Sequence, residues 1–280
     1  MIKIDNKEII ENSVGSIKLL ESLRDKLFFY TVCEKKGKIL SNRKDLKLPC
    51  QCKCFLNGKM PNLNGKLCTT FGHCYCQGLL GYIPSDFAKK YVPNIPTKNI
   101  PNFHVCRLML RLMAWDSISQ SPHYSIMDAV LSIFAWGGKT VLRHHNAWSK
   151  WLSIQENRTE LEEALKTQSI SLKSVPHIDG IAISFMSKIL FFFDKGKKNY
   201  ILDKNVKSAI KGLFGKNFDA YNYDKYNQFL ITLTSILKLT SPELTEILLW
   251  HYQIASGQKA KPHYTCKDIL SGRNLPTLIA

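Results

Sequence analysis

Apolar residues recur at intervals of three and four along most of the chain after Val105, and this spacing predicts helices rather than strands. The predicted helices are Val105 to Trp115, Ser125 to Phe134, Thr140 to Ile154, Thr159 to Lys166, Ile183 to Phe193, Lys204 to Phe214, Lys225 to Leu239 and Pro242 to Tyr252. Ser241 before Pro242 is a specific helix start, because serine caps helices and proline suits the first helical position. The sequence therefore predicts a mainly α fold.

The first part of the chain has a different pattern. Ile9 to Leu27 has helical spacing, and Phe28 to Cys33 is typical of a short strand. From Gly37 to Pro101, glycine, proline, asparagine and cysteine interrupt every candidate element. We therefore expect a Cys-rich, partly β N-terminal region over residues 1–104 and a helical domain over residues 105–280.

Charge indicates the class of partner. The 280 residues include 39 basic and 22 acidic ones, a formal net charge of +17, which favours nucleic acid, with an anionic membrane as the second choice. The acidic residues near the start argue against a signal peptide. The lack of a long apolar run argues against a membrane span. We expect a cytoplasmic, monomeric protein that has no membrane partner.

Lysines are densest between residues 188 and 216, where the only acidic residues are Asp194 and Asp203. These lysines are Lys188, Lys195, Lys197, Lys198, Lys204, Lys207, Lys211 and Lys216. The stretch forms either a surface that faces phosphates or an ordinary solvated face of a basic protein.

Six cysteines lie close together at Cys50, Cys52, Cys54, Cys68, Cys74 and Cys76. In extended strands they could supply enough thiolates for a structural zinc ion. Their C-x-C spacing differs from the C-x-x-C of ordinary zinc knuckles, so reduced packing thiols are the alternative. A zinc-dependent processing enzyme centred on these thiols would also need a nearby acid, and only Asp45 and Asp86 are near. We expect no cofactor to be required for catalysis.

Gly180 lies in a predicted tight turn just before the helix that begins at Ile183. Backbone N–H groups at such a helix start can hold a phosphate without any side chain. Further along, Asp203 follows two apolar residues and precedes another helix, where it could simply be an N-cap.

These residues resemble the helix-hairpin-helix DNA glycosylases, in particular their 8-oxoguanine-glycosylase-like branch. The segment from Ile178 to Ala182 stands where that family has its Leu-Pro-Gly-Val-Gly hairpin, and Asp203 follows Gly180 by 23 residues, the separation the family requires. The resemblance implies a DNA glycosylase that flips a modified base out of double-stranded DNA and hydrolyses its N-glycosidic bond, leaving an abasic site. Asp203 would then be the catalytic carboxylate.

Two positions depart from the family pattern. Ala182 replaces the second hairpin glycine, which is tolerable if its φ stays negative. Ser184 stands where lyase-competent members have a lysine nucleophile, which predicts a monofunctional enzyme. Lys188, one helical turn later, could supply an amine, or it could face DNA or solvent. Other members of the family that this chain resembles bind an iron–sulfur cluster through a set of C-terminal cysteines. The tail here contains only Cys266, so no such cluster is expected.

The resemblance and the basic residues together give a candidate DNA-binding set and a candidate base pocket. The DNA-binding residues are Gly180, Ala182, Ser184, Lys204, Lys207, Lys139 and Arg143, and the base pocket consists of Trp136 and Phe185. Both aromatic residues could instead pack in the core. His144 and His145 suggest a helix surface pair rather than a metal site, since adjacent side chains diverge.

Three functions stay open. The chain also resembles a bacterial branch that includes an anti-phage glycosylase acting on glucosylated hydroxymethylcytosine. Repair of 8-oxoguanine is an alternative substrate choice. A noncatalytic DNA-binding protein, in which Asp203 only caps a helix, is the alternative from another class.

Overall fold

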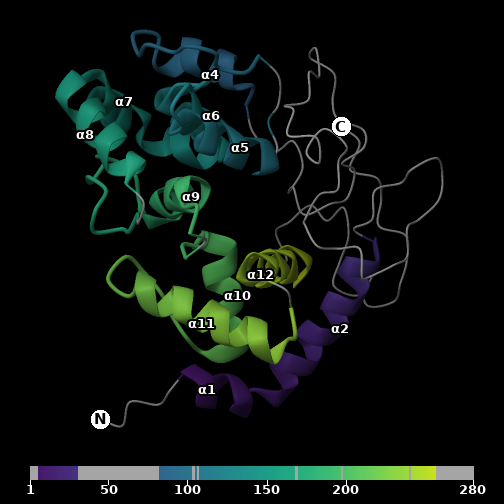
Figure 1. Cartoon of the computed structure of the whole chain (residues 1–280). Helices are drawn as coiled ribbons and strands as arrows, with labels where there is room; N and C mark the ends of the chain where they lie inside the picture. Colours follow the sequence, from purple (N-terminus) through teal and green to yellow (C-terminus); the bar gives the residue numbers. More distant parts are fainter. Residues whose placement is uncertain are drawn as a thin grey trace, which may run out of the picture. The chain divides into compact units, whose positions relative to one another are not determined.

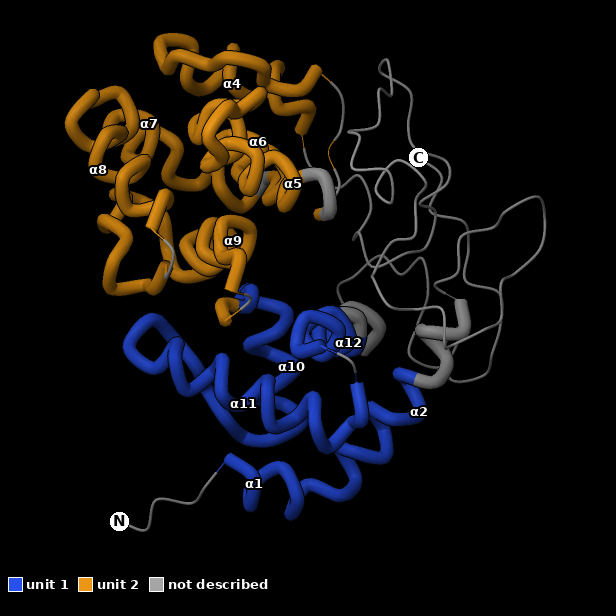
Figure 2. Tube along the Cα trace, in the orientation of Figure 1, with its two compact units in different colours: residues 1–51, 70–75, 200–280 blue, residues 52–69, 76–199 orange. Residues whose placement is uncertain are grey.

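The computed structural model describes residues 6–30, 82–102, 105, 107–167, 170–196, 198–239 and 241–256. Over these residues the regular structure is helical, with no strand, which confirms the mainly α fold (Figure 1). None of the described helices has the length and apolar character needed to cross a membrane. The helices form two compact units, which Figure 2 colours separately.

Unit 1 joins helices from both ends of the chain. They are α1 (Asn6–Asn12), α2 (Val14–Tyr30), α10 (Lys204–Phe214), α11 (Tyr223–Ile236) and α12 (Pro242–Ser256). Helix α12 packs against α2, α10 and α11, and α1 packs against α11. Ser16 Oγ in α2 donates a hydrogen bond to the Leu213 carbonyl at 2.7 Å. The N-terminal helices therefore share one core with the helices after residue 200.

Helix α10 has clear start and stop signals. Asp203 caps its first turn, and Gly215 ends it in the left-handed conformation, with φ 64°. Its buried face consists of Val206, Ala209, Ile210, Leu213 and Phe214, which recur at helical spacing. This strong local pattern is why the sequence predicted the same bounds that the structure has.

Unit 2 is built around a buried helix. Its helices are α4 (Pro84–Tyr91), α5 (Arg107–Ser117), α6 (Ile126–Trp136), the 3-10 helix η3 (Gly138–His144), α7 (His145–Ser153), α8 (Gln155–Lys166) and α9 (Ile183–Phe193). Every residue of α6 is buried, and α6 contacts α4, α5, α9 and η3. Ser125 and Asp128 form a capping box at its start. The Asp128 carboxylate also accepts from the backbone N–H groups of Lys98 and Asn99, which fixes that loop to α6.

The structure corrects several predictions for the N-terminal region. The predicted strand at 28–33 is wrong for residues 28–30, which extend α2, because adding residues to a formed helix costs little. Residues 31–33 lie outside the described residues. The predicted helix from Ile9 to Leu27 is interrupted at Ser13, whose Oγ donates to the Ile9 carbonyl at 2.9 Å.

Two further expectations differ from the structure: that every element between Gly37 and Pro101 is interrupted, and that the chain divides between residues 104 and 105. Residues 84–91 form α4, which begins at Pro84 and buries Phe87 and Ala88. Both α4 and α5 pack against α6, so the compact units do not divide at residues 104 and 105. The predicted helix from Thr140 to Ile154 is split into η3 and α7.

Candidate functional site

The predicted hairpin turn is present in unit 2. The Ile181 N–H donates to the Ile178 carbonyl at 3.0 Å, and Gly180 between them has φ +75°. A Cβ on Gly180 would also lie 2.9 Å from Cβ of both His144 and Ala147. Glycine is therefore needed here both for its positive φ and for the close approach of the turn to η3 and α7.

The hairpin leads directly into α9. Ala182 has φ −80° and caps α9 without a side-chain hydrogen bond, so the condition under which alanine is tolerable here, a negative φ, is met. Among the described groups, none accepts from the N–H groups of Ile183 and Ser184. On the other side of the hairpin the chain forms a single turn, in which the Ser174 N–H donates to the Ser171 carbonyl at 3.1 Å, rather than a regular helix. The helix start of α9 can accept an anion.

Lys188 is folded back along α9. Its side chain is only 7% exposed, and Nζ donates to the Ser184 carbonyl at 2.9 Å. Nζ also lies 4.9 Å from the centre of the Phe185 ring. The alternative of a solvent-facing lysine is therefore wrong, while the expected placement on one face with Ser184 is confirmed.

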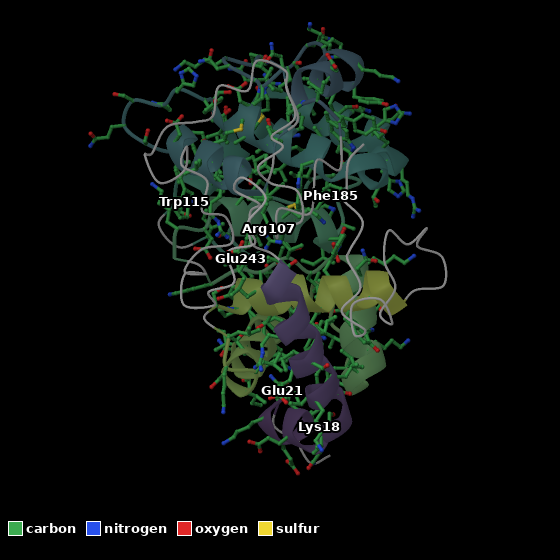
Figure 3. All side chains as sticks on the ribbon, turned by 90° about the vertical axis from the view of Figure 1, so that its right-hand side faces the viewer. Lys18, Glu21, Arg107, Trp115, Phe185 and Glu243 are labelled. Carbon is green, nitrogen blue, oxygen red and sulfur yellow. The ribbon has the colours of Figure 1, made fainter. Side chains whose placement is uncertain are left out.

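The two aromatic residues of the predicted base pocket are buried in the core of unit 2. Trp136 packs edge-on against Phe192, and Phe185, which Figure 3 labels, packs edge-on against Phe134. A Cβ on Gly137 would lie 2.1 Å from Cε1 of Phe185, so the glycine admits the ring. Trp136 Nε1 is buried and has no hydrogen-bond partner among the described residues. These contacts fit the core-packing alternative, with one indole N–H left available.

The basic residues after Trp136 lie in η3. Arg143 is exposed, and the Lys139 side chain lies outside the described side chains. His144 is exposed. His145 is half-buried, and the centre of its ring lies 5.7 Å from the centre of the Tyr91 ring of α4, in an edge-on arrangement. The two histidines thus diverge, and no group of metal-ligating side chains occurs among the described residues.

Asp203 lies in unit 1 at the start of α10. It is half-buried, and its Oδ1 accepts from the Asn205 and Val206 N–H groups at 2.9 and 3.0 Å. The N-cap prediction is confirmed. Both hydrogen bonds fall on Oδ1, so within the described residues the other oxygen, Oδ2, is unoccupied by a donor. One carboxylate oxygen is therefore fixed, and the second is open to a ligand.

The lysines near Asp203 differ in environment. Lys204 is exposed and Lys207 is half-buried, both on the first turn of α10 or just after it. Upstream in unit 2, Lys195 and Lys198 are exposed on a loop that the buried Asp194 stabilises. The Asp194 carboxylate accepts from the N–H groups of Gly196, Lys198 and Asn199. Asp194 therefore has a structural role, and the loop carries basic side chains outward.

Sequence reasoning missed three side chains of α11 that bind the backbone before Asp203. They are Tyr223, Tyr226 and Asn227, and each is hydrogen-bonded to Tyr200 or Ile201. Their polar groups recur on one face of a helix, which is the signal that could have found them.

Residues 88–250 match the family described as "Putative 8-oxoguanine DNA glycosylase OGG-like protein". The match covers more than half of the chain. The chain belongs to this OGG-like family. No curated protein and no solved structure matches. Membership places the protein among the DNA glycosylases, whose partner is DNA.

The OGG-like match contains the hairpin, Lys188 and Asp203, all of which sequence analysis had singled out. The six cysteines between residues 50 and 76 precede the matched span and lie outside the described residues. Structural zinc in this OGG-like protein therefore stays a prediction.

Proposed function

We propose that the protein is a monofunctional DNA glycosylase in which Asp203 carries hydrolysis of the N-glycosidic bond of a modified base. The observation that carries this proposal is the hydrogen bonding of the Asp203 carboxylate, in which Oδ1 accepts from two N–H groups while Oδ2 has no donor among the described residues. A fixed carboxylate with one free oxygen suits a reaction that develops positive charge on the sugar.

The proposed reaction uses water as the nucleophile. The water oxygen bonds to C1′ of the deoxyribose while the bond from C1′ to the base nitrogen breaks, and its electron pair leaves with the base. Oδ2 of Asp203 stabilises the charge on the sugar and accepts the proton from water. The departing base takes up a proton from solvent, and Asp203 returns the proton it accepted to solvent, so the products are a free base and an abasic site.

Binding of DNA is assigned to the hairpin and the basic residues. The open N–H groups of Ile183 and Ser184, following Gly180 and Ala182, would bind a backbone phosphate. Lys204, Lys207, Lys139 and Arg143 would add charge to phosphate contacts.

Monofunctional chemistry is supported by the surroundings of α9. Ser184 offers a hydroxyl rather than an amine where the resembling lyases have their nucleophile. The Lys188 amine donates to a carbonyl of its own helix and is buried, which favours a positioning role over attack on the sugar. Trp136 is retained as a candidate for the base pocket because its buried indole N–H has no acceptor among the described residues. Phe185, whose ring lies beside Gly137, is kept as the second candidate.

The substrate is proposed as a modified base in double-stranded DNA. The resemblance to the anti-phage branch favours glucosylated hydroxymethylcytosine, and the OGG-like family favours 8-oxoguanine. The deciding experiment incubates the protein with otherwise identical duplexes containing each base or no modification, and identifies released bases by mass spectrometry. Release of one modified base by the wild type and its loss in Asp203→Asn supports the proposal. Full release by Asp203→Asn removes the aspartate from the reaction, and DNA binding without any release favours a noncatalytic protein.

A further inference from the structure

The backbone before Asp203 is buried but has no regular secondary structure. Tyr200, Ile201 and Leu202 are at most 5% exposed and belong to no helix. Buried peptide groups need hydrogen-bond partners, and an irregular segment cannot supply its own. Its partners must therefore come from neighbouring elements.

Helix α11 supplies these partners through three side chains. Tyr223 Oη donates to the Tyr200 carbonyl at 2.7 Å, and Tyr226 Oη donates to the Ile201 carbonyl. The Tyr200 N–H donates to Asn227 Oδ1 at 3.2 Å. The three α11 residues are 2%, 0% and 6% exposed, so these bonds are shielded from water. Figure 2 shows α10 and α11 within the same unit.

The spacing explains how one helix reaches consecutive peptide groups. Tyr226 and Asn227 follow Tyr223 by three and four residues, so each lies on the same side of α11 as Tyr223. The Tyr223 and Tyr226 rings stack with centres 5.9 Å apart, which sets the two hydroxyls at neighbouring carbonyls. We name these three residues the α11 brace.

The brace ends two residues before Asp203. Consecutive Cα atoms are about 3.8 Å apart, so the last bonded carbonyl, that of Ile201, is within about 8 Å of the Asp203 Cα. On the other side, the N–H groups of Asn205 and Val206 hold Oδ1. Asp203 is thus held on both sides, by the braced segment that precedes it and by the first turn of α10 that follows it.

We infer that Tyr223, Tyr226 and Asn227 are positioning residues that fix the orientation of the Asp203 carboxylate. This inference rests on the proposed function of Asp203. The hydroxyl and amide groups are the essential parts, because a phenylalanine ring would fill the same space but remove the hydroxyl donors that Tyr223 and Tyr226 supply to the Tyr200 and Ile201 carbonyls.

The test removes the two hydroxyls and compares the result with a matched loss elsewhere on α11. The test variant is Tyr223→Phe with Tyr226→Phe. The control is Thr234→Val, which deletes another buried hydroxyl of α11, one bonded to the Leu230 carbonyl and to Thr245. Thermal unfolding verifies that both variants fold, and Tyr226→Phe alone replaces the double variant if that one does not.

Three quantities are measured: single-turnover release of the base identified by the substrate panel, affinity for a non-hydrolysed duplex, and amide exchange at Asn205 and Val206. Since small displacements of catalytic groups cost one to two orders of magnitude, release should slow about tenfold or more in the brace variant. Affinity should change less than about twofold, because no phosphate contact is removed. Thr234→Val should release the base at the wild-type rate.

Equal slowing in the brace variant and in Thr234→Val would overturn the inference, since it would reflect loss of stability alone. The exchange measurement separates this failure from failure of the proposed function. If Asp203→Asn retains full release, the catalytic assignment fails. The brace is then still supported if Asn205 and Val206 exchange faster in the brace variant than in Thr234→Val, and it is rejected if their exchange is unchanged.

Discussion

At the scale of single residues, Gly180 is constrained in two independent ways. Its φ of +75° and the 2.9 Å approach of the His144 and Ala147 Cβ atoms both exclude a side chain. We expect Gly180→Ala to lower the free energy of unfolding by about 1–3 kcal/mol, the usual cost of such backbone strain. It should also weaken DNA binding, because the start of α9 would shift.

A matched glycine serves as the control for Gly180. Gly212 lies within α10, and a Cβ there would meet nothing within 4 Å. Gly212→Ala should therefore raise the free energy of unfolding by about 0.5–1 kcal/mol. Denaturant unfolding of both variants checks the pair, and similar changes in the two would contradict the role given to the turn.

Lys188 gives a second prediction at the residue scale. If water is the nucleophile, borohydride reduction during turnover should trap no adduct between protein and DNA. The product should be an intact abasic strand that breaks only after heat or alkali. An adduct that forms with the wild type and disappears with Lys188→Met, which keeps much of the buried stem, would instead make Lys188 the nucleophile.

At the scale of elements, Asp203 is both the N-cap of α10 and the proposed catalytic carboxylate, and two substitutions separate these roles. Asparagine caps helices as well as aspartate does, so Asp203→Asn should keep the free energy of unfolding within about 0.5 kcal/mol of wild type. Asp203→Ala should lower it by about 1 kcal/mol. Base release should be lost in both.

Denaturant unfolding and base release, measured on the same samples, check this prediction. If base release falls only where the free energy of unfolding falls, so that it is lost in Asp203→Ala and kept in Asp203→Asn, Asp203 acts only as a cap. Loss in both variants despite normal stability of Asp203→Asn would indicate direct participation of the carboxylate.

At the scale of the whole molecule, the charge of +17 predicts DNA affinity that falls with salt. Each phosphate contact contributes about 0.9 to the slope of log affinity against log salt concentration. Lys204→Gln with Lys207→Gln should therefore reduce the slope by nearly 2, if both contact phosphates.

The control for this salt dependence removes the same charge from the N-terminal helices. Lys7 pairs with Glu11 at 3.8 Å on α1, and Lys18 is exposed on α2, where Figure 3 labels it. Lys7→Gln with Lys18→Gln should leave the slope nearly unchanged. Equal slopes for the two double variants, measured by fluorescence anisotropy with one unmodified duplex, would assign the effect to net charge rather than to α10.

The sequence alone determined the elements whose signals are local. Apolar spacing predicts the bounds of α9 and α10, the positive φ of the turn favours glycine at position 180, and capping chemistry favours aspartate at position 203. A short segment carries each of these signals by itself. Tertiary structure alone decided the burial of Lys188, the inclusion of α1 and α2 in the core with α12, and the α11 brace. These depend on contacts between residues far apart in the chain, and no local pattern specifies which distant groups will meet.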